Sequence, residues 1–87
     1  MNVEQIEKFL KQKHAPEQQV KIDFKARTTM YGLFVEGKDY TDLKVKNFWR
    51  IISVTNLEAY NKSKDTSLAK IFSGAAFSRL AFKDKVI

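Results

Sequence analysis

The most constraining feature of the sequence is a change in the spacing of its apolar residues between residues 10 and 20. Before this change, apolar residues recur at helical spacing: Val3, Ile6, Phe9 and Leu10. After it, apolar and charged residues alternate: Val20, Ile22, Phe24 and Ala26 against Lys21, Asp23, Lys25 and Arg27. Because strand side chains alternate between two faces, this second pattern indicates a half-buried strand. The chain therefore begins with one amphipathic helix and continues as sheet.

The predicted helix covers residues 2–13. Asn2 is a candidate N-cap, and Gln5 stands three residues later in the capping-box position. Pro16 disfavours helical backbone at the residue before it and so ends the helix. We expect Val3, Ile6 and Leu10 to form the stripe that packs on the sheet.

Five short strands are predicted after the helix. They cover residues 20–26, 30–36, 48–55, 56–61 and 68–73, the fourth being the weakest. Residues 40–47 are polar and read as a loop, whereas 75–82 fit a helical turn as well as a strand. Gly32 and Gly74 are structural glycines, expected where strands bend or backbones approach closely. The predicted fold class is α+β and mainly β, with a strongly bent five-stranded antiparallel barrel over residues 18–82.

Composition excludes several classes of function. The 87 residues suffice for a single domain, 1–87, with a frayed tail at 83–87. There is no cysteine and one histidine, His14, so we expect no metal site. No phosphate loop, nucleophile elbow or zinc-protease motif appears, so we expect no catalysis and no cofactor. No apolar run could span a membrane, and the expected location is the cytoplasm.

The charge distribution points to a polyanionic partner. The formal net charge is +6, and residues 62–87 carry six basic against two acidic side chains. Residues 44–50 interleave cations with aromatic rings, the combination that binds phosphates and bases. Because strand side chains alternate, one of Phe48 and Trp49 must face the core and leave the other exposed. The basic tail could also serve solubility alone.

Short motifs resemble those of the Sm-like family, and within it the Hfq branch of bacterial RNA chaperones. They are Val-x-Ile-x-Phe at 20–24, Gly32 followed by Phe34 and Asp39, and the apolar residues that surround Gly74. The resemblance implies an Sm-like (SH3-like) barrel that assembles into a homo-oligomeric ring and binds RNA, with Gln5 and Tyr40 at the RNA. Ser73-Gly74 stands where the family has Lys-His or Arg-Gly, and residues 44–64 exceed the family's length. The resemblance therefore supports the family's fold for this chain better than it supports the family's RNA pocket.

The sequence thus predicts a non-catalytic protein that binds single-stranded RNA. The candidate RNA-binding residues are Gln5, Tyr40, Lys44, Lys46, Trp49, Arg50 and Lys70. The alternative is a small β-barrel that acts as a structural or protein-interaction module without nucleic acid.

Overall fold

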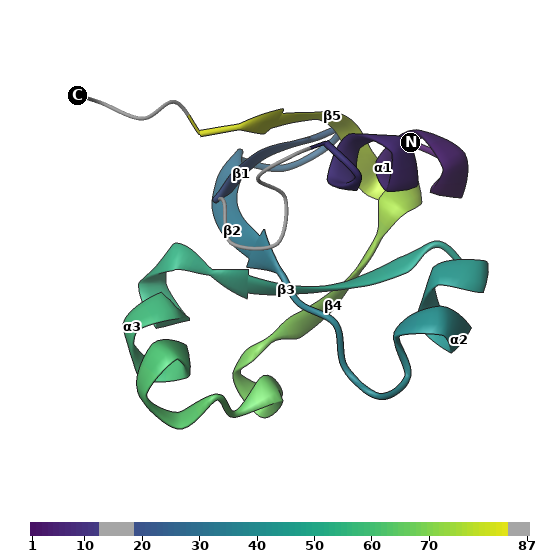
Figure 1. Ribbon diagram of the computed structural model, residues 1–87. Helices are drawn as coiled ribbons and strands as arrows, with labels where there is room; N and C mark the ends of the chain where they lie inside the picture. The colour runs from purple at the N-terminus through teal and green to yellow at the C-terminus, as the bar shows by residue number, and fades with distance from the viewer. Residues whose placement is uncertain (13–18, 84–87) are drawn as a thin grey trace.

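The computed structural model describes residues 1–12 and 19–83 and contains an N-terminal helix and a five-stranded antiparallel sheet (Figure 1). In chain order the elements are α1 (Val3–Leu10), β1 (Val20–Phe24), β2 (Met30–Phe34), α2 (Tyr40–Val45), β3 (Phe48–Ser53), α3 (Val54–Ser63), β4 (Lys70–Ser73) and β5 (Phe77–Phe82). Short 3₁₀ helices, η2 (Thr66–Leu68) and η3 (Gly74–Ala76), flank β4. The predicted α+β class, mainly strand, is confirmed. The predicted stop at Pro16, His14 and residues 84–87 of the tail lie outside the described residues.

The sheet is sharply curved. Its strands pair in the order β4-β3-β2-β1-β5, so β4 and β5 form the two edges. Only the three residues of η3 connect these opposite edges, which forces the sheet to curl back on itself. In Figure 1, β3 and β4 cross below β1 and β5, and β2 runs from one group to the other.

The helix α1 begins as predicted. The Asn2 side chain accepts from the Gln5 amide at 2.8 Å, and the Gln5 side chain accepts from the Asn2 amide at 2.9 Å. This reciprocal capping box satisfies two amides that have no partner inside the helix. Of the predicted stripe, Ile6 is fully buried, whereas Val3 and Leu10 are half-buried against the core.

The core lies on the concave face of the sheet. Val20, Ile22 and Phe24 of β1 are buried, as their alternation predicts. The other buried members of the core are Ile6, Trp49, Ile51, Phe77 and Leu80. The opposite face is also covered where α3 packs on β2 and β3, and there Ile52 has no exposed surface. Within the described ranges, no helix is long and apolar enough to cross a membrane.

Two predicted elements need correction, and one alternative that the sequence left open is decided. Residues 40–47 are not a loop, because Tyr40–Val45 form α2. Residues 56–61 are not a strand but lie in α3, which starts where Ser53 accepts from the Thr55 amide at 3.4 Å. The ambiguous stretch 75–82 contains β5, which pairs with β1 and so supplies the fifth strand.

Both glycines named in the sequence are buried at close approaches. A Cβ at Gly32 would lie 2.7 Å from the backbone oxygen of Ile52 on β3. A Cβ at Gly74 would lie 2.5 Å from Cδ1 of Ile6. Among the described residues no glycine has a positive φ, so the requirement here is for space and not for an unusual backbone conformation.

Candidate nucleic-acid interface

Lys44, one of the predicted RNA contacts, is engaged in an ion pair that joins two helices. Its Nζ lies 2.5 Å from Oε2 of Glu7, so α2 is tied to α1. The hydrogen bond from Lys44 lowers the pKa of Glu7, and the same bond raises the pKa of Lys44. Lys44 is therefore already partnered by a carboxylate.

Arg50 is held in the same way. Its two terminal nitrogens contact the two carboxylate oxygens of Asp39 at 2.5 and 3.2 Å. This bidentate geometry is the strong form of an Arg–carboxylate pair. It lowers the pKa of Asp39 below its ordinary value and fixes the loop before α2 onto β3.

Trp49 is buried, which corrects its assignment as a stacking residue. Only 1% of its surface is exposed, and its Nε1 donates to Oδ1 of Asn47 at 2.8 Å. Phe48 points to the other face and is 37% exposed. The expectation that one ring faces inward and one outward is confirmed, and Phe48 is the accessible ring.

The remaining predicted residues do not gather into one surface. Gln5 is exposed but serves the capping box of α1. Tyr40 is half-buried with its ring edge-on to Trp49, and burial together with the nearby Glu36 raises its pKa. Lys46 and Lys70 are exposed and stand at opposite ends of the β3–β4 ladder.

A surface that the sequence analysis missed lies on the convex side of β1. Lys21 pairs directly with Tyr31 on β2 and with Ala81 on β5, and Asp23 pairs with Arg79. Directly paired residues share a face, and here it is the face opposite the buried Val20 and Ile22. We call the residues Lys21, Tyr31, Arg79 and Lys83 the basic face.

The centre of the basic face is an accessible ring with cations around it. Tyr31 is 38% exposed, and Nζ of Lys83 lies 5.8 Å from the centre of its ring. Asp23, the acid on this face, accepts a hydrogen bond from the Thr29 hydroxyl at 2.7 Å. In the part of the chain that the structure describes, no ion pair involves Lys21 or Arg79. The charge of Lys21 is therefore available to an external anion, whereas Arg79 lies directly across from Asp23.

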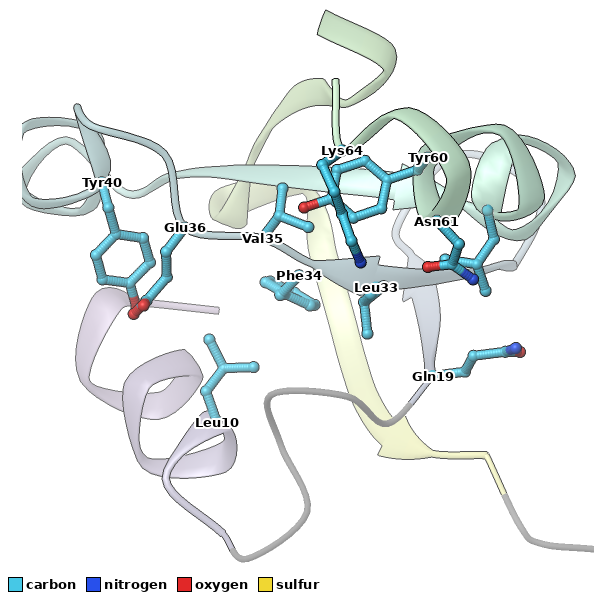
Figure 2. A pocket seen from close by; sticks show the side chains of 11 residues that line it. Leu10, Gln19, Leu33, Phe34, Val35, Glu36, Tyr40, Tyr60, Asn61 and Lys64 are labelled. Carbon is cyan, nitrogen blue, oxygen red and sulfur yellow. The ribbon is translucent and has the colours of Figure 1, made fainter. Parts of the chain in front are cut away.

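A groove of about 560 Å³ lies between the end of β2 and α3 (Figure 2). We call it the α3 groove; it is lined by Leu10, Gln19, Leu33, Phe34, Val35, Glu36, Tyr40, Leu57, Tyr60, Asn61 and Lys64. The last pair between β1 and β2 joins Val20 to Gly32, so the chain from Leu33 onward extends past β1. The groove runs along this extension. Leu57, Tyr60, Asn61 and Lys64 reach it because their spacing places them on one side of α3.

Comparisons with known proteins return no match to a family model, a curated protein or a solved structure. Among the described residues, no group of three or more histidine, cysteine or acidic side chains could hold a metal ion.

Proposed function

We propose that the protein binds single-stranded RNA without catalysis, and that the basic face is the surface that meets it. The observation that carries this proposal is the exposed ring of Tyr31, which has Lys21 paired opposite it and Lys83 over it. Proteins that bind single strands combine stacking rings with cations that follow the phosphates. The basic face offers both on three adjacent strands.

Kinship with the Sm-like family is part of this proposal. It is supported by the helix followed by five strands and by the return of β5 to a place beside β1. We further propose that copies assemble into a ring through β4 and β5, since edge strands readily pair between chains. The molar mass in solution, measured by light scattering, tests the ring directly, and a monomer would contradict it.

Titration of fluorescent oligo-U and oligo-A at several salt concentrations tests RNA binding. Tyr31→Ala should weaken binding about 5- to 150-fold if one base stacks on the ring. Lys21→Ala should lower the salt dependence of the affinity by about 0.7 in log–log slope. Lys62→Ala is the control, because it removes an exposed cation of α3 that pairs with Glu58 and is not part of the basic face.

Two results would contradict the proposal. Wild-type protein that ignores both oligonucleotides at low salt would remove RNA as the partner. Equal losses for Lys21→Ala and Lys62→Ala would show that only net charge matters and that the basic face is not the interface.

A second candidate function, protein interaction, rests on exposed apolar side chains. Phe48 is 37% and Ile71 50% exposed, and both lie on the convex face beside the edge strand β4. Such a pair at a sheet edge suits contact with another polypeptide. If the chain binds a protein partner, if this binding does not change with salt and if Ile71→Lys abolishes it, this function is favoured over RNA binding.

A further inference from the structure

The α3 groove combines an apolar floor with polar groups at its rim. Leu33, Phe34 and Val35 follow the extension of β2, and Leu57 of α3 also lines the groove. Its volume falls in the range of small-ligand sites in proteins. A flat, largely apolar body would fit such a space, provided that its polar edges meet the rim.

The rim carries opposite charges at different positions. Figure 2 shows Glu36 beside Tyr40 at one end, and the contribution of Glu36 to the raised pKa of Tyr40 agrees with this placement. Lys64 stands on the α3 wall, with its Nζ 5.4 Å from the centre of the Tyr60 ring. Within the described ranges neither Glu36 nor Lys64 takes part in an ion pair. A complementary ligand therefore has a hydrogen-bond donor for Glu36 and an anionic group for Lys64.

The groove is continuous with the basic face. Leu33 lies two residues after Tyr31 and therefore on the same face of β2, about 7 Å along the strand. Lys83 links the two features, because it lies over Tyr31 and its Nζ donates to Oε1 of Gln19 at 3.5 Å. Since Gln19 lines the groove, a nucleic-acid strand stacked on Tyr31 reaches the groove with its neighbouring nucleotide.

We propose that the α3 groove binds one nucleotide of the RNA strand and selects adenine or cytosine, which carry an exocyclic amino group where uracil has its 4-carbonyl, over uracil. Glu36 accepts from the amino group, as acidic side chains do from N4 of cytosine. Uracil has a carbonyl oxygen in that position, which repels the carboxylate. Lys64 contacts the phosphate, and Tyr60 contacts the ring. This inference rests on the proposed RNA binding and specifies which bases the RNA carries at this site.

The test is titration with AMP, CMP and UMP, monitored by calorimetry. We expect CMP and AMP to bind about 5- to 150-fold more tightly than UMP, the discrimination of one good base contact. Glu36→Gln should abolish this preference, because an amide donates to the carbonyl of uracil as readily as it accepts. Glu58→Gln, which removes an exposed carboxylate elsewhere on α3, should leave the preference intact.

A second arm tests the phosphate contact. Lys64→Gln should remove the advantage of AMP over adenosine, whereas Lys62→Gln on the same helix should not. Thermal melts followed by the fluorescence of Trp49 verify that each variant is folded.

The outcomes separate this inference from the proposed function. If oligonucleotides bind through Tyr31 with no preference among bases and mononucleotides do not bind, the groove inference is overturned and RNA binding stays in place. If mononucleotides bind with the stated preference and oligonucleotides do not bind, the basic face is refuted as the RNA interface and the groove is retained as a nucleotide site. Equal affinity for AMP, CMP and UMP would also overturn the inference.

Discussion

Asn47 is the residue whose substitution should reveal most about how the fold is held together. It joins α2 to β3 with a φ of 63°, in the left-handed region that asparagine tolerates better than most residues. Its Oδ1 accepts from Nε1 of the buried Trp49 at 2.8 Å, and its Nδ2 donates to the backbone oxygen of Met1 at 2.9 Å. Its own carbonyl accepts from the amide of Gly74 at 2.8 Å. One residue thus connects the N-terminal segment, β3 and the turn between the edge strands.

We expect Asn47→Ala to be strongly destabilising. The buried indole N–H of Trp49 would lose its acceptor, which costs about 1–3 kcal/mol. The contact with Met1 contributes about 1 kcal/mol, and the left-handed backbone costs alanine about 1 kcal/mol more. The expected loss is therefore about 3–5 kcal/mol. Asn47→Gly loses the same side-chain contacts but adopts the backbone freely, so it should be about 1 kcal/mol more stable than Asn47→Ala.

The assay is built into the chain, because Trp49 is its only tryptophan and its fluorescence reports unfolding. Urea titrations of the wild type and both variants give the three free energies of unfolding. For a domain of this size, a difference of 1 kcal/mol also separates melting temperatures by about 4–8 °C. An alanine variant as stable as the glycine variant would refute the role of backbone conformation. A wild-type-like stability in both variants would refute the role of the side-chain contacts.

Two further predictions concern stability. Gly32→Ala should cost about 1–3 kcal/mol of stability, because the new Cβ meets the backbone oxygen of Ile52 at 2.7 Å. Gly37→Ala should cost less, because there the new Cβ meets the end of a flexible side chain. Equal melting temperatures for the two variants would contradict this prediction. Because the pKa values of Asp39 and Glu7 are lowered in the folded state, their contribution to stability is present above their ordinary values of 3.8 and 4.5 and is lost as the pH falls through the lowered values. Urea unfolding midpoints that do not fall between pH 6 and pH 3 would contradict this predicted pH dependence.

The local features of the fold could be predicted from the sequence, because they depend on neighbouring residues. The Asn2 capping box needs only residues within one helical turn. The buried face of β1 needs only the alternation of Val20, Ile22 and Phe24. These signals are short-range and strong, so the helix and the first strand were assigned correctly.

The elements that were missed have weak or misleading local patterns. Leu57 and Ala59 alternate with polar neighbours and so imitate a strand, yet Leu57, Tyr60 and Lys64 recur at helical spacing on the groove side of α3. Helix α2 has no buried residue, so its sequence lacks the apolar stripe that would predict a helix. In both cases tertiary packing decides what propensity leaves open.

The surroundings of the candidate residues could not be predicted from the sequence, because they are set by long-range pairing. The cations at 44 and 50 find acidic partners far away in the sequence, as Lys44 does with Glu7. Conversely, Arg79 joins Lys21 and Tyr31 because β5 pairs with β1, a long-range contact that no local pattern reveals. Charge density along a chain is therefore a poor guide to charge density on a surface.

The pairing of β5 with β1 also sets the order in which the chain can fold. Val20 pairs with Phe82, so nearly the whole domain must be synthesised before β1 gains its second neighbour. Phe77 and Leu80, two members of the core, arrive with this last strand. Such long loop closure is slow, in the millisecond-to-second range for sheet-rich domains. On the ribosome, the hairpins made by β1, β2 and β3 must therefore wait with one flank of β1 open, and in that interval the nascent chain is exposed to strand exchange with its neighbours.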